Sequence, residues 1–352
     1  MASREDYSVG WICALPIEVA AAKAAFDRIH DPILSPGPDF DDINNYILAS
    51  IRGHNVVLVY PRLETCEYGQ MSTSLTKIAT QLHATFKSVR FNLMVGVAGG
   101  VPGTKEDIRL GDVVVSKSNA GRHGVIEYDT NGKQAEGQAI HDTALSADHQ
   151  PSPLLLAATG KAETAAIFDE SQVAQYISDI IRKDPTTFAY PGPEQDILFE
   201  SDYDHTTESE GNGCDHCNPD RIRPRQPRDE PQDVMVHYGL VASSHISMRH
   251  GVTRDKIAHE QGVLCFETEA AGLEDASKYL IIRGICDYAD SHTSNLWHAY
   301  AAAAAAAYAK EVLSFIPTVP KRIFLAPNTY SEAAPEEGLV EEEEQQWSRT
   351  NG

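Results

Sequence analysis

The chain has 352 residues, of which 42% are hydrophobic and 23% are charged, and its formal net charge at pH 7 is -22. This length and composition indicate a globular protein with enough core for one large α/β domain or two small ones. The acidic charge excludes a broad, non-specific nucleic-acid surface, because phosphate backbones are bound through Lys and Arg.

The N-terminal half alternates short apolar runs with amphipathic stretches, a pattern that predicts strands alternating with helices. In chain order we expect a strand at 7–15, a helix at 16–28, strands at 46–51 and 55–60, a helix at 69–86, and strands at 88–95 and 111–116. Pro16 suits the first turn of its helix, and Gly53 lies in the turn of an expected hairpin. Because a hairpin joins antiparallel strands, we expect a mixed sheet.

The C-terminal half continues the alternation and ends in a long alanine-rich helix. In chain order we expect helices at 154–166 and 170–183, a strand at 236–243, a helix at 253–261, a strand at 263–266, a helix at 267–278, a strand at 280–286, and a helix at 297–315. Strands that alternate with helices indicate the α/β class. We place a single domain at residues 1–316.

Two segments lack this alternation. Residues 202–232 are polar and rich in Pro, Gly, Asp and Arg, which predicts a long surface insertion. Residues 317–352 are expected to form a flexible tail; its end, 331–352, holds seven Glu and one Arg and carries -6 of the net charge. The scattered Cys residues and the lack of a signal-peptide pattern favour a cytoplasmic location, with the nucleus as the alternative.

Three acidic residues stand out from their surroundings. Glu269 and Asp287 each follow an otherwise apolar, strand-like run, and Glu18 lies near the N-terminus. Carboxylates in such places usually have a partner or a catalytic task. Each also has a simpler interpretation: Glu18 as a residue of the first helical turn, favoured by the helix dipole, Asp287 as a cap of the segment after its strand, and Glu269 as a solvated side chain.

Five sequence motifs resemble a known family when they are taken in order. They are 9–18 (VGWICALPIE), 95–100 (VGVAGG), 110–116 (LGDVVVS), 266–272 (FETEAAG) and 283–287 (RGICD). They resemble the nucleoside phosphorylase and nucleosidase superfamily, in particular its methylthioadenosine/S-adenosylhomocysteine nucleosidase branch. Similar fungal domains are found at the N-terminal end of immune-like receptors that contain NACHT, ankyrin or TPR domains. The resemblance spans residues 7–316, and we expect a stand-alone version of such a domain.

The resemblance implies a nucleoside phosphorylase-like fold, with a central mixed, partly barrel-like sheet flanked by helices. It also assigns roles to the three acids: Asp287 would protonate purine N7, Glu18 would activate water, and Glu269 would accept hydrogen bonds from the ribose hydroxyls. The other residues it places around the substrate are Gly96, Val97, Ala98, Gly99, Gly100, Ser247, Met248, Thr268 and Cys286.

Three departures from the family pattern affect the expected pocket rather than the acids. Thr268 replaces the usual Met beneath the ribose, 244–248 differs from the usual purine-contacting strand, and 63–69 lacks the small residues expected before Gly69. The base preference and the 5′ preference therefore stay open, while Glu18 and Asp287 match the family pattern.

The activity implied is that of a purine N-glycosidase. We expect hydrolysis of adenine nucleotides or nucleosides, with a modest preference for ATP, which would yield adenine and ribose triphosphate. The alternatives are a phosphorolytic purine nucleoside phosphorylase, a methylthioadenosine-type nucleosidase, or a non-enzymatic nucleotide-sensing or scaffold module. The expected partners are the small-molecule substrate and water, without nucleic acid, membrane or cofactor, and the family analogy suggests a homo-oligomer.

The insertion carries two further groups of residues. Its four arginines have two interpretations, a solvated basic loop or a clamp for the phosphates of a nucleotide. They are Arg221, Arg223, Arg225 and Arg228. Cys214 and Cys217, with His205 nearby, have the spacing of half a zinc site, but no second pair follows. We therefore expect no metal and keep these two cysteines as a weak candidate.

Overall fold

The structure is a computed structural model, and it describes most of the chain outside several loops and the C-terminal segment. The described residues are 3–33, 42, 44–61, 71–103, 106–118, 124–128, 152–205, 214, 216–228, 234–270 and 279–318, with the side chains of 71–75 excepted. The expected tail beyond 318, the 63–69 motif with Cys66, and most of the helix expected at 267–278 lie outside them. No helix among the described residues has the length and apolar character needed to cross a membrane.

Most strands lie where the sequence patterns predict them. The strands are β1 (Val9–Ile12), β2 (Arg28–Ile29), β3 (Asn44–Ile51), β4 (His54–Pro61), β5 (Phe91–Gly100), β6 (Val113–Ser116), β7 (Val125–Glu127), β8 (Val236–Ser243), β9 (Val263–Glu267) and β10 (Tyr279–Asp287). However, β1 is shorter than the predicted 7–15, and β5 begins three residues later and ends five residues later than the predicted 88–95. The hairpin prediction is confirmed: β3 and β4 pair antiparallel, and Gly53 in their turn has a φ of 82°. The short strands β2 and β7 were not predicted.

Six α-helices accompany these strands in the described part of the chain. They are α1 (Pro16–Ala25), α2 (Met71–Thr85), α3 (Pro153–Ile167), α4 (Val173–Lys183), α5 (Gly251–Gln261) and α6 (His298–Ser314). Two helix predictions are wrong at one end. Helix α1 ends at Ala25 instead of residue 28, because Arg28–Ile29 pairs with β3 as β2. At the other site, Glu267 ends β9, and the backbone bends at 268–270 instead of entering a helix. The strand continues because Glu267 and its two predecessors are buried beside β8 and β5, so tertiary pairing outweighs local helix propensity.

The sheet closes on itself at one end. Strand β10 pairs with β5 along one edge and with β6 along the other, and the ring is completed through β8 and β9. From β5 the sheet extends outward through β1, β4, β3 and β2. The predicted fold class, an α/β domain with a mixed, partly barrel-like sheet, is confirmed.

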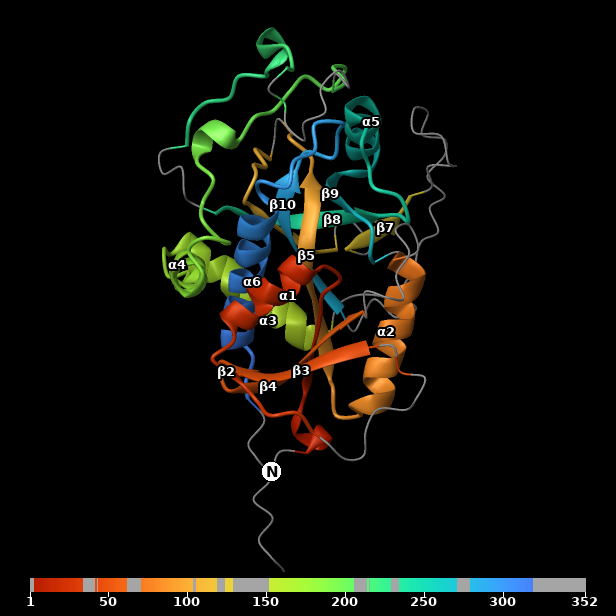
Figure 1. Cartoon of the computed structure of the whole chain (residues 1–352), viewed down its shortest axis with the longest axis vertical. Helices are drawn as coiled ribbons and strands as arrows, with labels where there is room; N and C mark the ends of the chain where they lie inside the picture. Colours follow the sequence, from red (N-terminus) through yellow and green to blue (C-terminus); the bar gives the residue numbers. More distant parts are fainter. Residues whose placement is uncertain are drawn as a thin grey trace, which may run out of the picture. The chain divides into compact units, whose positions relative to one another are not determined.

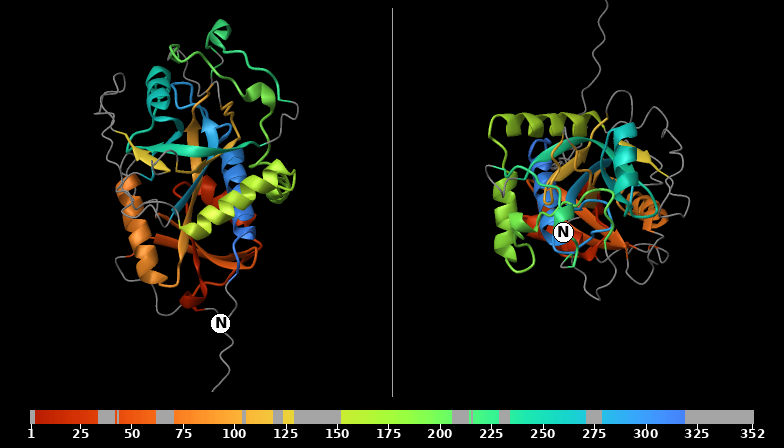
Figure 2. Two further views of the ribbon diagram at one scale, coloured as in Figure 1. Left: turned by 180° about the vertical axis from the view of Figure 1, so that it is seen from behind. Right: turned by 90° about the horizontal axis from the view of Figure 1, so that it is seen from above.

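Helices cover both sides of this sheet (Figures 1 and 2). Helices α1, α3 and α6 lie together in Figure 1, and their apolar faces share one core with the strands, while α2 packs in a separate core. The alanine run of α6 explains its close fit, because a Cβ on Gly284 of β10 would lie 1.9 Å from the Ala301 carbonyl oxygen. Small residues on both elements thus bring the helix directly against the strand that carries Asp287.

Candidate active site

Glu18 lies in the first turn of α1, just after β1 ends, and the residue is 2% exposed. Its Oε2 atom accepts hydrogen bonds from the backbone N–H groups of Ala14 and Leu15, both at 2.9 Å. Its Oε1 atom accepts another, also at 2.9 Å, from the N–H of Val97 in β5. The first two bonds fit the simple helix-start interpretation of Glu18. The third hydrogen bond attaches the Glu18 carboxylate to a different strand, β5.

A gap in the pairing of β5 explains why the carboxylate reaches that strand. Along one edge, β5 pairs with β1 up to Met94 and with β9 from Gly99 onward. In between, the Cys13 thiol donates to the Val95 carbonyl at 3.3 Å, and Glu18 accepts from Val97. These two side chains take the place of a neighbouring strand, which satisfies the buried backbone groups and fixes Glu18 beside 95–98.

Arg283 is the centre of a buried ion-pair cluster at the same level of β5. It is fully buried in β10 and lies opposite Gly96. Its Nη1 donates to Glu269 Oε2 and its Nη2 donates to Glu267 Oε2, both at 2.6 Å. A Cβ on Gly96 would lie 2.2 Å from Arg283 Nη1 and 2.5 Å from Glu18 Oε1. Glu18 and Arg283 therefore meet over the same glycine, with Glu269 held by the arginine.

The charges in this cluster do not balance. Three carboxylates, those of Glu18, Glu267 and Glu269, surround one guanidinium, so the formal charge of the four groups is -2. Burial raises the pKa of Glu18, against the opposing effect of Arg283. Burial, with the charges of Glu18 and Glu267, also raises the pKa of Glu269 to about 8, although its 2.6 Å ion pair alone would favour the ionised form. Raised proton affinities of this kind suit acid–base chemistry near neutral pH.

Asp287 ends β10, four residues after Arg283, and lies next to Gly99 of β5. Its Oδ1 atom accepts a hydrogen bond of 2.8 Å from the N–H of Ala289, so the carboxylate does cap the turn after its strand. Burial raises its pKa, which favours the protonated acid. Ligand atoms of Asp287 and His298 lie within 4.8 Å of each other, which places an imidazole beside this carboxyl.

The Cys286 thiol links the two parts of the site. It lies 3.7 Å from Asp287 Oδ2, and burial raises its pKa, with the charges of both Asp287 and Glu18 contributing. Gly96 and Gly99, which face Glu18 and Asp287 respectively, are three residues apart in β5, or about 10 Å at the usual rise of a strand. Glu18 and Asp287 therefore lie at the two ends of one short stretch of β5.

The glycine at position 96 provides a test of this arrangement. In Gly96→Ala, the new Cβ would collide with Arg283 Nη1 and Glu18 Oε1, and a displacement of about 1 Å in a catalytic group costs about 100-fold in rate. For the release of adenine that the sequence leads us to expect, we predict such a loss, measured by chromatography. Gly160→Ala in α3 is the matched control, since a Cβ there meets nothing within 4 Å. Equal rates for the two variants would contradict the arrangement.

The remaining predicted substrate-binding residues differ in exposure. Those buried in the structure are Val97, Ala98, Gly100, Met248 and Cys286. Thr268 is half-buried between Glu267 and Glu269, and Ser247 is exposed. Because Asp287 is also half-buried, solvent reaches the site at the end where Asp287 and Thr268 lie. Their roles in binding a substrate stay predictions.

Three of the four arginines in the insertion are paired with carboxylates. The pairs are Arg221–Asp202, Arg225–Asp196 and Arg228–Asp112. Arg225 also donates to the hydroxyl of Tyr288, the residue after Asp287, at 2.7 Å. Arg223 is exposed, and its backbone N–H donates to the Leu198 carbonyl. Arg225 thus lies next to the end of β10, and a role of the four arginines in binding phosphates stays a prediction.

Two cavities lie outside the acidic cluster. The larger has a volume of about 440 Å³, and the smaller has about 370 Å³. The larger is lined by residues that include Arg109, Arg223, Arg225, Arg228, Trp297 and Tyr300. Neither cavity is lined by Glu18, Glu269 or Asp287. Residues 271–278, which follow directly after Ala270 near the cluster, lie outside the described residues.

Two members of the cluster were missed by the sequence interpretation. Arg283 lies in the apolar run 281–285, so the signal that singled out Glu269 and Asp287, a charge in a buried strand, applies to it equally. Glu267 was hidden because we expected a helix to begin there. Its carboxylate instead accepts backbone N–H bonds from Glu269 and Ala270 and thereby shapes the bend that holds Glu269.

The chain shares its fold with solved nucleosidases. It is similar to a putative 5′-methylthioadenosine/S-adenosylhomocysteine nucleosidase from Borrelia burgdorferi B31 bound to adenine, with a TM-score of 0.52 and 13% identity over 88% of this chain and 100% of the other. The corresponding nucleosidase from Neisseria meningitidis, in complex with methylthio-immucillin-A, has a TM-score of 0.50 and 15% identity over 87% of this chain and 98% of the other. The predicted resemblance to this superfamily is confirmed for the fold.

A relative in sequence comes from a fungus. A nucleotide-binding leucine-rich repeat (NLR)-like protein of Hyaloscypha variabilis is 40% identical over 314 residues, which is 89% of this chain. The chain spans 30% of the length of that relative. No protein-family model matches the chain.

Proposed function

We propose that this chain, which has the nucleosidase fold and the acidic cluster, is an enzyme that hydrolyses the N-glycosidic bond of adenine nucleosides or nucleotides. The observation that carries the proposal is the position of Glu18 and Glu269 beside Arg283, with Asp287 four residues after Arg283 in β10. This arrangement offers a group for water, a group for the sugar and an acid for the leaving base. The two solved structures reported above are a nucleosidase and a putative nucleosidase, and the second of these is bound to adenine.

Asp287 would supply the proton to the departing base. Cleavage leaves positive charge on the sugar and negative charge on the purine, so an acid at the base side lowers the barrier. The raised pKa of Asp287 keeps this carboxyl protonated over a wider pH range. Its half-buried position at the end of β10 lets a base approach from solvent.

Glu18 would accept a proton from the attacking water. Its Oε1 atom accepts one hydrogen bond from the protein, so a lone pair remains for a water. The raised pKa of Glu18 makes its carboxylate a stronger base. Glu269, held by Arg283 at 2.6 Å, would then accept hydrogen bonds from the ribose hydroxyls with its remaining lone pairs.

The charge of the cluster favours water over phosphate as the nucleophile. A phosphorylase must hold a phosphate dianion beside the sugar, and this requires an excess of positive charge. Around Gly96 the cation among the described residues is Arg283, and it is already held by Glu267 and Glu269, so it is not available to hold a phosphate dianion. Hydrolysis is therefore the better match to the described residues.

A substrate panel tests the proposal. Purified protein is incubated with ATP, adenosine and methylthioadenosine, each with and without inorganic phosphate, and free adenine is quantified by chromatography. Adenine release that does not depend on phosphate supports the hydrolase. A strict need for phosphate would support a phosphorylase, and tight nucleotide binding without any release of base would support a sensing module.

Our preferred substrate within this class is ATP, and Arg223 provides a test of it. Arg223→Ala leaves the three arginine–carboxylate pairs of the insertion intact. If the arginines bind the 5′-phosphates, kcat/KM for ATP should fall about tenfold, the loss of one charge-assisted bond of about 1.5 kcal/mol, while kcat/KM for adenosine stays unchanged. Lys161→Ala in α3 is a control for the loss of one surface charge. An equal change for ATP and adenosine would contradict the phosphate-binding role.

A further inference from the structure

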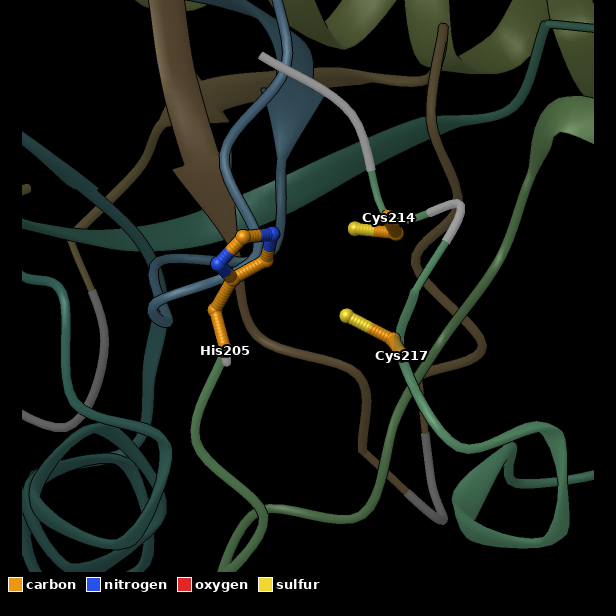
Figure 3. Close-up of side chains that lie close together, drawn as sticks. All are labelled: His205, Cys214 and Cys217. Carbon is orange, nitrogen blue, oxygen red and sulfur yellow. The ribbon is translucent and has the colours of Figure 1, made fainter. Parts of the chain in front are cut away.

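The insertion brings together an imidazole and two thiols that the proposed active site does not use. One ligand atom each from His205, Cys214 and Cys217 lies within 4.8 Å of the other two. Figure 3 shows both sulfur atoms pointing toward the His205 ring. The N–H of Cys217 bonds to the Cys214 carbonyl at 3.0 Å, a tight turn that lets both thiols of a Cys-x-x-Cys pair face one point.

A fourth candidate ligand, His292, lies beside His205. The side chain of His292 is 4% exposed, and its ring centroid is 5.6 Å from that of His205. Neither of its ring nitrogens has a hydrogen-bond partner among the described residues, and the nearest carboxylate oxygen, of Asp290, is 3.6 Å from Nδ1. Leaving buried polar atoms without a partner costs about 1–3 kcal/mol. A ligand at this place would remove that cost.

We propose that His205, Cys214 and Cys217 bind one zinc-class divalent cation, with His292 as the fourth ligand. Two sulfur and two imidazole ligands form the usual tetrahedral set for structural zinc, and thiolates select against Mg²⁺ and Ca²⁺. Zn–N bonds of about 2.0–2.1 Å place two imidazole centres on one tetrahedral ion about 5 Å apart. The observed distance of 5.6 Å is close to this value, but the His292 nitrogens lie outside the group of ligand atoms that are within 4.8 Å of one another, so His292 would have to move toward the ion on binding.

The sequence spacing did not reveal this set because the fourth ligand lies far along the chain. His292 comes 75 residues after Cys217. It lies in the loop after β10, and only the fold brings this loop and the insertion together. Asp290 would then support His292 from its other nitrogen, as carboxylates commonly do for metal-bound histidines.

The cation would fasten the insertion to the loop that follows Asp287. The N–H of His205 already donates to Ser291 Oγ at 2.8 Å, and the His292 ring stacks on Phe199 and Tyr203. Ligands from both segments would convert these contacts into a cross-link five residues from Asp287. Metal binding to thiolates also contributes directly to folding free energy. The metal site does not depend on the proposed activity.

Metal content provides the first test. Protein expressed in zinc-supplemented medium and dialysed against metal-free buffer without chelator should contain about one zinc per chain by plasma mass spectrometry. Cys214→Ser and Cys217→Ser should each lose most of it. His216→Asn is the matched control: it is an exposed residue in the same turn and should keep its zinc. Wild-type protein with far less than one zinc, or equal zinc in all variants, would overturn the proposal.

A second measurement covers the case in which a cysteine variant fails to fold. Wild-type protein stripped with a chelator is titrated with Co²⁺, and thiolate ligation is read from a sulfur-to-cobalt charge-transfer band and the intense visible bands of tetrahedral Co²⁺. These bands should saturate at one equivalent and disappear when Zn²⁺ is added. Their absence, or a Cys214–Cys217 disulfide found by mass spectrometry in freshly purified protein, would overturn the proposal.

The assignment of His292 has its own test. His292→Phe keeps a ring stacked on Phe199 and Tyr203 but removes both nitrogens. We expect the zinc affinity to fall at least tenfold and the visible bands of bound Co²⁺ to shift, because one nitrogen ligand is lost. An unchanged spectrum and affinity would rule out His292 and leave three protein ligands.

Discussion

Asp287→Asn should reduce the rate of adenine release by about 100-fold to 10,000-fold, the range that a positioned general acid contributes. The substitution is close to isosteric, and the Asn carbonyl can still accept the Ala289 N–H bond that shapes the turn after β10. The amide cannot donate a proton to a leaving base. Binding of adenine nucleotides should persist, so the loss should appear in kcat, measured by chromatography at saturating substrate.

The pH dependence gives Asp287→Asn a second readout. Burial raises the pKa of Asp287, so the wild-type rate should fall as pH rises through that pKa and the acid loses its proton. This basic limb of the profile should be absent in the variant. Glu311→Gln is the matched control, because Glu311 is also a buried carboxyl with a raised pKa, about 20 Å along α6 from His298. A variant with wild-type kcat and an unchanged profile would show that Asp287 is only a turn cap.

Glu18→Ala should lower the rate of adenine release by a similar 100-fold to 10,000-fold, through loss of the base that activates water. A structural loss is also expected, because the N–H groups of Ala14, Leu15 and Val97 lose their acceptor. Activity alone therefore does not separate the two roles. Added formate should separate them, since a small carboxylate that enters the vacated space can accept the proton from water.

We expect formate to restore part of the rate in Glu18→Ala, whereas chloride at the same ionic strength should not. Glu311→Ala is the control: its carboxylate accepts bonds from Ser171 and Gln172 and lies outside the cluster, so formate should leave its rate unchanged. Thermal unfolding of both variants measures the structural cost. A Glu18→Ala protein that is folded, inactive and indifferent to formate would contradict the role of Glu18 as the base.

Much of the fold was predictable because local signals agreed with the final packing. The strand at 236–243 was placed correctly from its apolar run, and the hairpin around Gly53 from its turn residue. The closure of the sheet was predicted only through the family resemblance, since local signals cannot show that β10 pairs with both β5 and β6, which precede it by more than 150 residues. The start of β9 was predicted correctly, but its end was not. Glu267 has a strong helix propensity, and only its burial in the folded chain reveals that it belongs to the strand.

The candidate site was predictable in part for a similar reason. A charge within an apolar run pointed to Glu269 and Asp287, and the resemblance added Glu18 from a distant segment. Neither signal provided Arg283, which lies beside Glu18 and Glu269, because its central position arises only when β10 lies against β5 at Gly96. The roles of the acids, the homo-oligomer, the cytoplasmic location and the acidic tail stay predictions from the sequence.

The central claim, that water breaks a bond between adenine and a ribose under the action of these acids, has one direct measurement. Wild-type protein is incubated in ¹⁸O-labelled water with ATP, adenosine or methylthioadenosine. The sugar product is analysed by mass spectrometry as soon as the reaction is stopped. The account predicts free adenine together with one ¹⁸O in the sugar, independent of added phosphate. A complete absence of free adenine, or a sugar product that carries a new phosphate and no label, would contradict it.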